Sequence, residues 1–209
     1  MRLFKQNRKD HWERVYHKHP PTEVGWYQAH PDNSLKLINK TCTDTHCRII
    51  DVGGGTSLLT KCLLDQGYRK LTVLDISGNS IEKAKSHLGT KSNRVAWIEA
   101  DITKYSFNDQ FDVWHDRAVF HFLTKIEDRK SYVNSLNSSL KLTGHLILAT
   151  FSPDGPPKCS GLPVVRYSPE SLQNELGGNF HLAESFKEIH LTPSGLSQSF
   201  VYCRFVRQA

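Results

Sequence analysis

The sequence lacks long apolar runs, and no segment of its 209 residues approaches the roughly 20 apolar residues that span a bilayer. Its five cysteines are an odd number without regular spacing, which argues against a disulfide framework. Cys42 and Cys47 have no second pair for a zinc site, so no metal is expected. The basic first ten residues are followed by no hydrophobic block, so no secretory signal is expected. We therefore expect a globular domain in the reducing cytoplasm.

The sequence also lacks a concentrated charge of either sign. Its 27 lysines and arginines exceed its 21 acidic residues, but they are spread along the chain. No basic run is interleaved with aromatic residues, as a nucleic-acid-binding stripe would require. We therefore expect no specific nucleic-acid partner and no membrane partner, and the sequence does not determine the oligomeric state.

Two short helices are predicted near the N-terminus. Between Lys9 and His19, Trp12 and Tyr16 are spaced among charged residues as in an amphipathic helix, which Pro20 and Pro21 end. A second helix is expected after the start signal Pro31–Ser34.

From residue 48 onward, β-branched strands alternate with helices. The predicted strands cover residues 48–52, 71–75, 94–99, 111–115 and 145–151, and the helices between them 56–66, 79–88 and 128–142. This alternation indicates right-handed crossovers and a parallel sheet covered on both faces. A capped helix over 168–176 then precedes two strands, 180–191 and 197–207, whose short link suits a hairpin. We predict a three-layer, Rossmann-like α/β fold with seven strands, mostly parallel, the last antiparallel.

The most informative motif is a glycine turn between a strand and a helix, with acidic residues beside it. Gly53, Gly54 and Gly55 follow Asp51, and Asp75 and Asp101 follow the next two strands. Glycines let a ligand approach the backbone, and strand carboxyl ends are where open α/β folds bind ligands. A ribose would suit Asp75, whereas the carboxylate of Asp51 would repel a pyrophosphate.

The segment Asp51–Ser57, together with Asp75, Asp101-Ile102 and the terminal hairpin, resembles the class I S-adenosylmethionine-dependent methyltransferases. The resemblance extends from about residue 38 to residue 205 and departs at Ser57, where the third motif glycine is commonest. It implies a methyltransferase domain over 41–209 and an N-terminal helical lid over 1–40, in one compact unit.

The resemblance implies S-adenosylmethionine as the cofactor. The cofactor-binding residues that we expect are Asp51, Gly53, Gly54, Gly55, Ser57, Asp75, Ile76, Asp101, Ile102, His115, Trp26 and Tyr27. Aromatic faces favour a sulfonium, so Trp26 and Tyr27 are candidates, although they could instead only pack the lid on the core. The acceptor-binding candidates are Trp12, Tyr16, Cys159 and His190.

In this family, residues near the transferred methyl follow the fourth strand. Asp116 and Arg117 are candidates there, as is His121, which could be a general base. Alternatively, Asp116 and Arg117 cap a short helix. Cys159, in the long loop after the fifth strand, could equally be a packing residue.

The acceptor is constrained by motifs that are missing. The chain has no Asn/Asp-Pro-Pro-aromatic motif of base-amino methyltransferases, no paired glutamates after the fourth strand and no Pro-Cys nucleophile. An O, N or S atom of a small molecule remains, or a protein side chain such as lysine. Two alternatives are a non-catalytic S-adenosylmethionine-binding protein and a nicotinamide-dependent oxidoreductase, which Leu58 in place of a third glycine disfavours.

Overall fold

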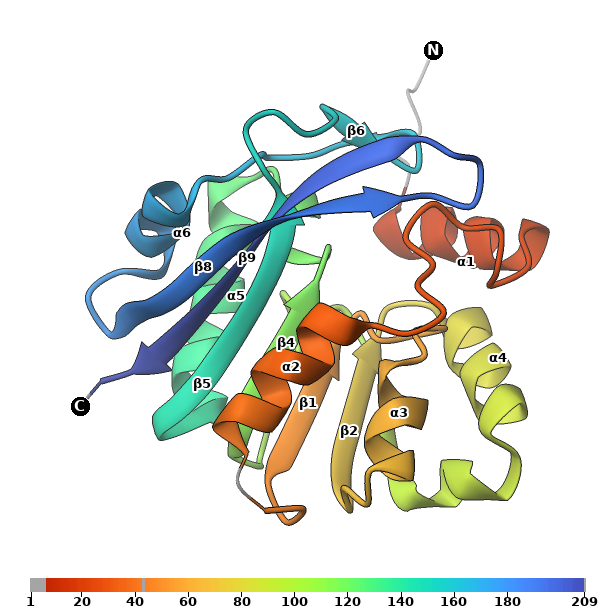
Figure 1. Cartoon of the computed structure of the whole chain (residues 1–209), viewed down its shortest axis with the longest axis horizontal. Coiled ribbons are helices and arrows are strands. Elements are labelled where there is room, and N and C mark those ends of the chain that lie inside the picture. The colour runs from red at the N-terminus through yellow and green to blue at the C-terminus, as the bar shows by residue number, and fades with distance from the viewer. Residues whose placement is uncertain (1–6, 43, 209) are drawn as a thin grey trace.

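A twisted seven-stranded sheet runs through the computed structural model, which describes residues 7–42 and 44–208 (Figure 1). The strand order is β3-β2-β1-β4-β5-β9-β8. The strands are β1 (Arg48–Val52), β2 (Lys70–Asp75), β3 (Val95–Glu99), β4 (Phe111–Arg117), β5 (Leu140–Phe151), β8 (Phe180–Leu191) and β9 (Ser197–Arg207). Neighbouring strands from β3 to β5 are parallel, and β9 is antiparallel to both β5 and β8. The predicted sheet is confirmed.

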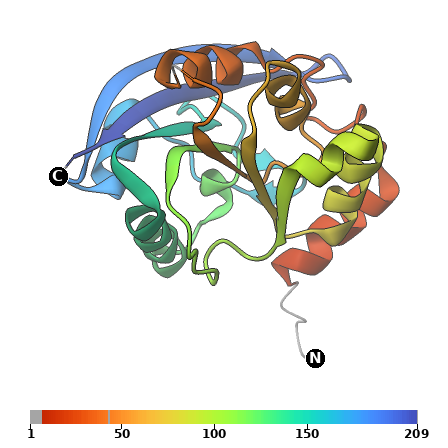
Figure 2. The same cartoon turned by 90° about the horizontal axis from the view of Figure 1, so that it is seen from below.

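Helices cover both faces of this sheet, as the view from below shows (Figure 2). The helices are α1 (Arg8–Lys18), α2 (Asp32–Thr41), α3 (Leu59–Asp65), α4 (Gly78–Leu88), α5 (Ile126–Ser139) and α6 (Pro169–Leu176), with 3-10 turns at Gly89–Arg94 and Phe120–Phe122. A small hairpin, β6 (Lys158–Cys159) and β7 (Leu162–Pro163), lies in the loop after β5. Residues 1–6 of the expected lid lie outside the described residues.

The two-residue period of the central strands builds a separate core on each face. In β1, Ile50 packs in the core that contains α5 and α6, whereas Ile49 packs in the core that contains α2 and α3. In β4, Trp114 packs in the core with α5 and α6, and Val113 packs in the core with α2 and α3. Burial on both faces explains why these strands are continuously apolar rather than alternating.

Capping residues set several helix boundaries as expected. The Ser168 hydroxyl accepts from the Ser171 amide in a capping box, with Pro169 in the first helical turn. Helix α3, however, begins at Leu59 and not at residue 56, because the Ser57 amide donates to the Gly54 carbonyl in a turn. Strand β5 begins already at Leu140, which is fully buried and pairs with β4.

The cysteines depart from the expectation. A disulfide joins Cys42 and Cys47, with 6.0 Å between their Cα atoms, and so ties the end of α2 to the approach to β1. The sequence analysis expected no disulfide framework and did not predict this bridge. Among the described residues, no group of side chains could hold a metal ion, and no helix is long and apolar enough to cross a membrane.

Candidate active site

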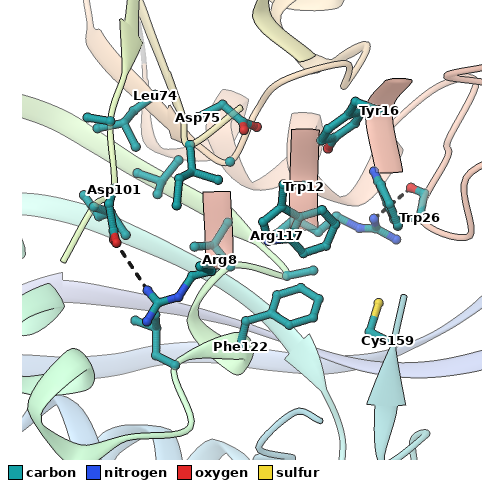
Figure 3. A pocket seen from close by; sticks show the side chains of 18 of the residues that line it. Arg8, Trp12, Tyr16, Trp26, Leu74, Asp75, Asp101, Arg117, Phe122 and Cys159 are labelled. Atoms are coloured by element: carbon teal, nitrogen blue, oxygen red, sulfur yellow. Dashed lines mark hydrogen bonds and ion pairs between the residues drawn. The ribbon is translucent and has the colours of Figure 1, made fainter. Parts of the chain in front are cut away.

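A cleft lies at the carboxyl ends of β1, β2 and β4, beneath α1. It consists of two adjoining cavities that share Tyr16, Trp26, Gly53 and Arg117. The first cavity encloses about 780 Å³, part of it open to solvent, and extends toward Asp101 (Figure 3). The second reaches Asp51 and the turn after β1. Parallel strands place their ligand sites at this edge of a sheet.

The turn after β1 requires glycine at three positions because its surroundings leave no room for a Cβ atom. Gly53 has a φ of +72°, and a Cβ there would lie 2.1 Å from Val119. A Cβ on Gly54 would lie 2.4 Å from Asp51 Oδ2, and one on Gly55 would lie 2.5 Å from Asp75 Oδ2. Side chains at these positions would therefore displace the acids or close the cleft. Gly53 and Gly54 line the cavities, and Gly55 lies behind them.

Asp51 belongs to a buried chain of hydrogen bonds. Its Oδ1 lies 2.7 Å from His115 Nδ1, and His115 Nε2 lies 2.9 Å from Ser34 Oγ on α2. A carboxylate only accepts, so His115 Nδ1 is the donor. All three residues line the second cavity. Asp51 Oδ2 is buried without a partner among the described residues, so an acceptor oxygen is free for a ligand.

Asp75, at the end of β2, lines the first cavity beside Ile76. Burial raises the pKa of Asp75 to about 7, although hydrogen bonds from Ser77 and Ser80 oppose this rise. The Ser77 amide donates to its Oδ1 at 2.9 Å. Burial destabilises the charged form of this carboxyl group, so a ligand that donates hydrogen bonds to it would stabilise that form.

A third acid, Asp101, lines the same cavity with Ile102. Its Oδ1 accepts hydrogen bonds from the amide and the hydroxyl of Thr103, at 3.0 and 2.7 Å. Arg8 of α1 lies 3.5 Å from the same oxygen and 2.6 Å from Asp128 (Figure 3). The three acids of the sequence analysis are thus brought to one cleft.

The roof of the cleft is aromatic. Trp12 of α1 packs edge-to-face on Trp26, with ring centroids 5.6 Å apart, and on Phe122, at 5.0 Å. Tyr16 contacts both tryptophans, at 6.2 and 6.0 Å. Trp12, Tyr16 and Trp26 line the first cavity, and Tyr27 and Ser57 line the second.

Polar contacts hold α1 over the cleft. The Glu13 carboxylate accepts hydrogen bonds from the Gly78 and Asn79 amides, at 2.7 and 3.2 Å, and from the Ser77 hydroxyl at 3.0 Å. Glu13 thus satisfies free amides at the start of α4, where the helix dipole favours a negative charge. Lys83 of α4 in turn donates to the Tyr16 carbonyl.

Two of the three predicted catalytic residues lie outside the cleft, which corrects their expected roles. Asp116 is fully buried, and it accepts hydrogen bonds from the Val119 and Phe120 amides and from the Tyr132 hydroxyl. It caps the 3-10 turn, as the alternative interpretation proposed. His121 is also fully buried, and burial lowers its pKa to about 3. Neither side chain lines the cleft.

Arg117, the third catalytic candidate, lies in the cleft and lines both cavities. Cys159 lines the first cavity, and burial raises the pKa of its thiol to about 12, so the thiol is neutral. His190 lines neither cavity, because its ring is turned to the Gly25 carbonyl, 2.9 Å from Nε2. The structure therefore does not bring His190 into the cleft with the other acceptor-binding candidates.

Several residues of the cleft were not predicted from the sequence. The unpredicted lining residues of the first cavity are apolar except for Arg8. The unpredicted lining residues of the second cavity include the polar Gln28 and Ser34. Arg8 and Ser34 lie on α1 and α2, whose orientation on the sheet the sequence does not reveal. The missed lining residues are Arg8, Val52, Leu74, Ala100, Ala118, Val119, Phe122, Leu123 and Phe200, with Pro21, Val24, Gln28, Pro31, Ser34, Thr56 and Leu58 in the second cavity.

Comparisons with known proteins agree with this geometry. Residues 50–148 match the family described as "Methyltransferase domain". Malonyl-[acyl-carrier protein] O-methyltransferase of Anoxybacillus flavithermus is 35% identical over 105 residues, covering 49% of this chain and 38% of that protein. The chain thus spans less than half the length of this relative.

Two further proteins resemble the chain over a larger share of their lengths. EEF1A lysine methyltransferase 2 of Homo sapiens is 24% identical over 191 residues, covering 84% of this chain and 75% of that protein. The crystal structure of a SAM-dependent methyltransferase from Anabaena variabilis superposes with a TM-score of 0.74 at 16% identity, covering 97% and 96% of the two chains. The Anabaena variabilis protein and this chain thus share the same fold.

Proposed function

Because this chain carries a methyltransferase domain of the class I, S-adenosylmethionine-dependent fold, we propose that it is an enzyme which transfers a methyl group to a small-molecule acceptor. The observation that carries the proposal is the unpartnered oxygen of buried Asp51 beside the glycine turn. A free buried acceptor costs folding energy unless a ligand satisfies it. The positively charged amino group of S-adenosylmethionine has the matching chemistry.

The other acids of the cleft suit the same cofactor. Asp75 would accept hydrogen bonds from the two ribose hydroxyls, while Asp101 and Ile102 would hold the adenine. The aromatic roof of Trp12, Tyr16 and Trp26 would contact the sulfonium, a cation that favours aromatic faces. When bound, S-adenosylmethionine supplies a methyl group already activated by the positive sulfur, so the protein has to align the acceptor and exclude water.

The lid supports a small acceptor. Residues of helix α1 and Trp26 line the first cavity and leave only part of it open to solvent, which favours a small acceptor over a protein side chain. We propose that residues 1–40 act as this lid and residues 41–209 as the methyltransferase domain. A protein lysine remains the second candidate, because EEF1A lysine methyltransferase 2 matches 84% of the chain. A cytoplasmic location remains a prediction from the sequence.

Calorimetry with S-adenosylhomocysteine and with NAD tests the cofactor assignment. We expect saturable binding of the first and none of the second. Activity with labelled S-adenosylmethionine on cell extract, separated into metabolite and protein fractions, then tests the acceptor. Label in the metabolite fraction supports the proposal, label in protein supports the lysine alternative, and binding without transfer to either supports a non-catalytic binding protein.

A further inference from the structure

We propose that the acceptor is a small organic anion, a carboxylate or a thiolate, bound beside Arg117 in the aromatic part of the cleft. This part is defined by Trp12, Trp26, Phe122 and Phe200. The inference rests on the proposed methyl transfer, and it specifies which acceptor that site takes.

Where the acceptor would lie, the described residues offer no base. Among the described residues that line the first cavity, the only acids are Asp75 and Asp101, which lie toward the ends of β2 and β3 and have been assigned to the cofactor. No imidazole lines this cavity, and the Cys159 thiol is neutral. An alcohol or a protonated amine must lose a proton before it can attack, whereas a carboxylate or a thiolate carries none to lose.

Arg117 brings a positive charge to the cleft in a fixed position. Its Nε donates to the Tyr202 hydroxyl and its Nη1 to the Trp26 carbonyl, each at 3.0 Å. Its guanidinium carbon lies 4.5 Å from the centroid of the Phe200 ring. These contacts immobilise a cation in a mostly aromatic wall. The Arg117 side chain would therefore lose little conformational entropy when an anionic ligand binds to it.

One nitrogen of Arg117 makes no hydrogen bond with the described residues. Its Nη2 is buried and forms only a long ion pair with Glu188, whose Oε2 lies 3.8 Å away and also lacks a hydrogen-bond partner. Glu188 is itself bound through Oε1 by Gln28 and Asn33, at 3.2 and 2.7 Å. Arg117 lines both cavities and Glu188 lines neither, so an occupant of the cleft meets the positive charge first.

The transfer step balances without a proton. The lone pair of the acceptor oxygen or sulfur forms the new bond to the methyl carbon. The bond between methyl and sulfur breaks, and its electron pair stays on sulfur. An anion and a cation thereby become two neutral products, and a low-polarity aromatic wall favours this loss of charge. A lysine ammonium would instead face the like charge of Arg117 and keep its proton.

Ligand binding in the presence of saturating S-adenosylhomocysteine tests the proposal. The probes are benzoate, thiophenol as its thiolate at pH 8, benzyl alcohol and benzylamine, measured by calorimetry. We expect the two anions to bind about tenfold or more tightly than the neutral and cationic probes. The Arg117→Met variant should lose this preference, and Arg117→Lys should keep part of it. Lys187→Met, an equal charge change at an exposed lysine paired with Asp154, should keep all of it.

The outcomes separate the two proposals. Equal binding of all four probes, or an anion preference that survives in Arg117→Met, would overturn the anionic acceptor. Absence of S-adenosylhomocysteine binding by the unmodified protein would instead overturn the proposed function. Each variant is first titrated with S-adenosylhomocysteine, and if Arg117→Met fails to fold, the partial loss in Arg117→Lys decides. Product analysis then distinguishes the acceptors, because base hydrolyses a methyl ester and leaves a methyl thioether intact.

Discussion

Replacing His115 with leucine provides a sharp test of the buried chain at the second cavity. Leucine fills similar space but cannot donate to Asp51 Oδ1, which now accepts at 2.7 Å. Asp51 is 4% exposed and His115 is 2% exposed, so water does not readily replace the lost donor. We expect Asp51 to turn its carboxylate, and the free Oδ2 to lose its alignment with the ligand.

The expected loss follows from the contact that disappears. A hydrogen bond to a charged group contributes about 1.5–3 kcal/mol. If binding depends on this alignment, the dissociation constant of S-adenosylhomocysteine should rise about 10- to 150-fold in His115→Leu. His115→Asn retains an N–H donor near the position of Nδ1, so it should bind more tightly than His115→Leu. Ser34→Ala removes only the bond to Nε2, and its effect should be smaller.

Calorimetry at fixed pH measures these constants, and thermal melts confirm that each variant is folded. The double variant with Asp51→Asn completes a mutant cycle. The losses of affinity in the two single variants should be clearly less than additive, because both substitutions act through the carboxylate oxygens of Asp51. Unchanged affinity in His115→Leu, or additive losses in the cycle, would refute the view that His115 positions Asp51.

Four further outcomes are expected. Cofactor affinity should fall up to about tenfold per pH unit below pH 7, because the raised pKa of Asp75 leaves it protonated there, and Asp75→Asn should remove this dependence in calorimetry. Gly54→Ala should abolish cofactor binding by displacing the neighbouring carboxylate, whereas Gly178→Ala, with nothing within 4 Å, should bind normally. Asp116→Asn should lower stability in thermal melts by about 1–3 kcal/mol and leave cofactor affinity nearly unchanged, whereas a large loss of affinity at full stability would restore a role at the ligand. Glu13→Gln should speed the release of S-adenosylhomocysteine in stopped-flow experiments, and an unaltered rate would show that α1 does not gate release.

The fold was predictable because its signals are local. Apolar runs, capping serines and the link between 191 and 197 each follow from a few consecutive residues. The cofactor side of the cleft was predictable for a similar reason, since Asp51, Asp75 and Asp101 each end a strand, and parallel strands bring their ends together.

The acceptor side was not predictable, because it depends on where β4 ends. We expected this strand to end at residue 115, which would leave Asp116 near the cleft. The strand continues to Arg117, and its two-residue period turns Asp116 toward Tyr132 of α5. The orientation of a helix on the sheet is equally hidden, so Ser34 and Arg8 escaped notice.

The cap formed by Asp116 has a consequence for the shape of the cleft. This carboxylate holds the amides of Val119 and Phe120 from below, and Val119 meets the turn at Gly53 from above. The floor of the ligand site is therefore anchored from inside the protein by a group no ligand can touch. A change at this hidden anchor would therefore weaken the floor of the site without altering any residue that lines it.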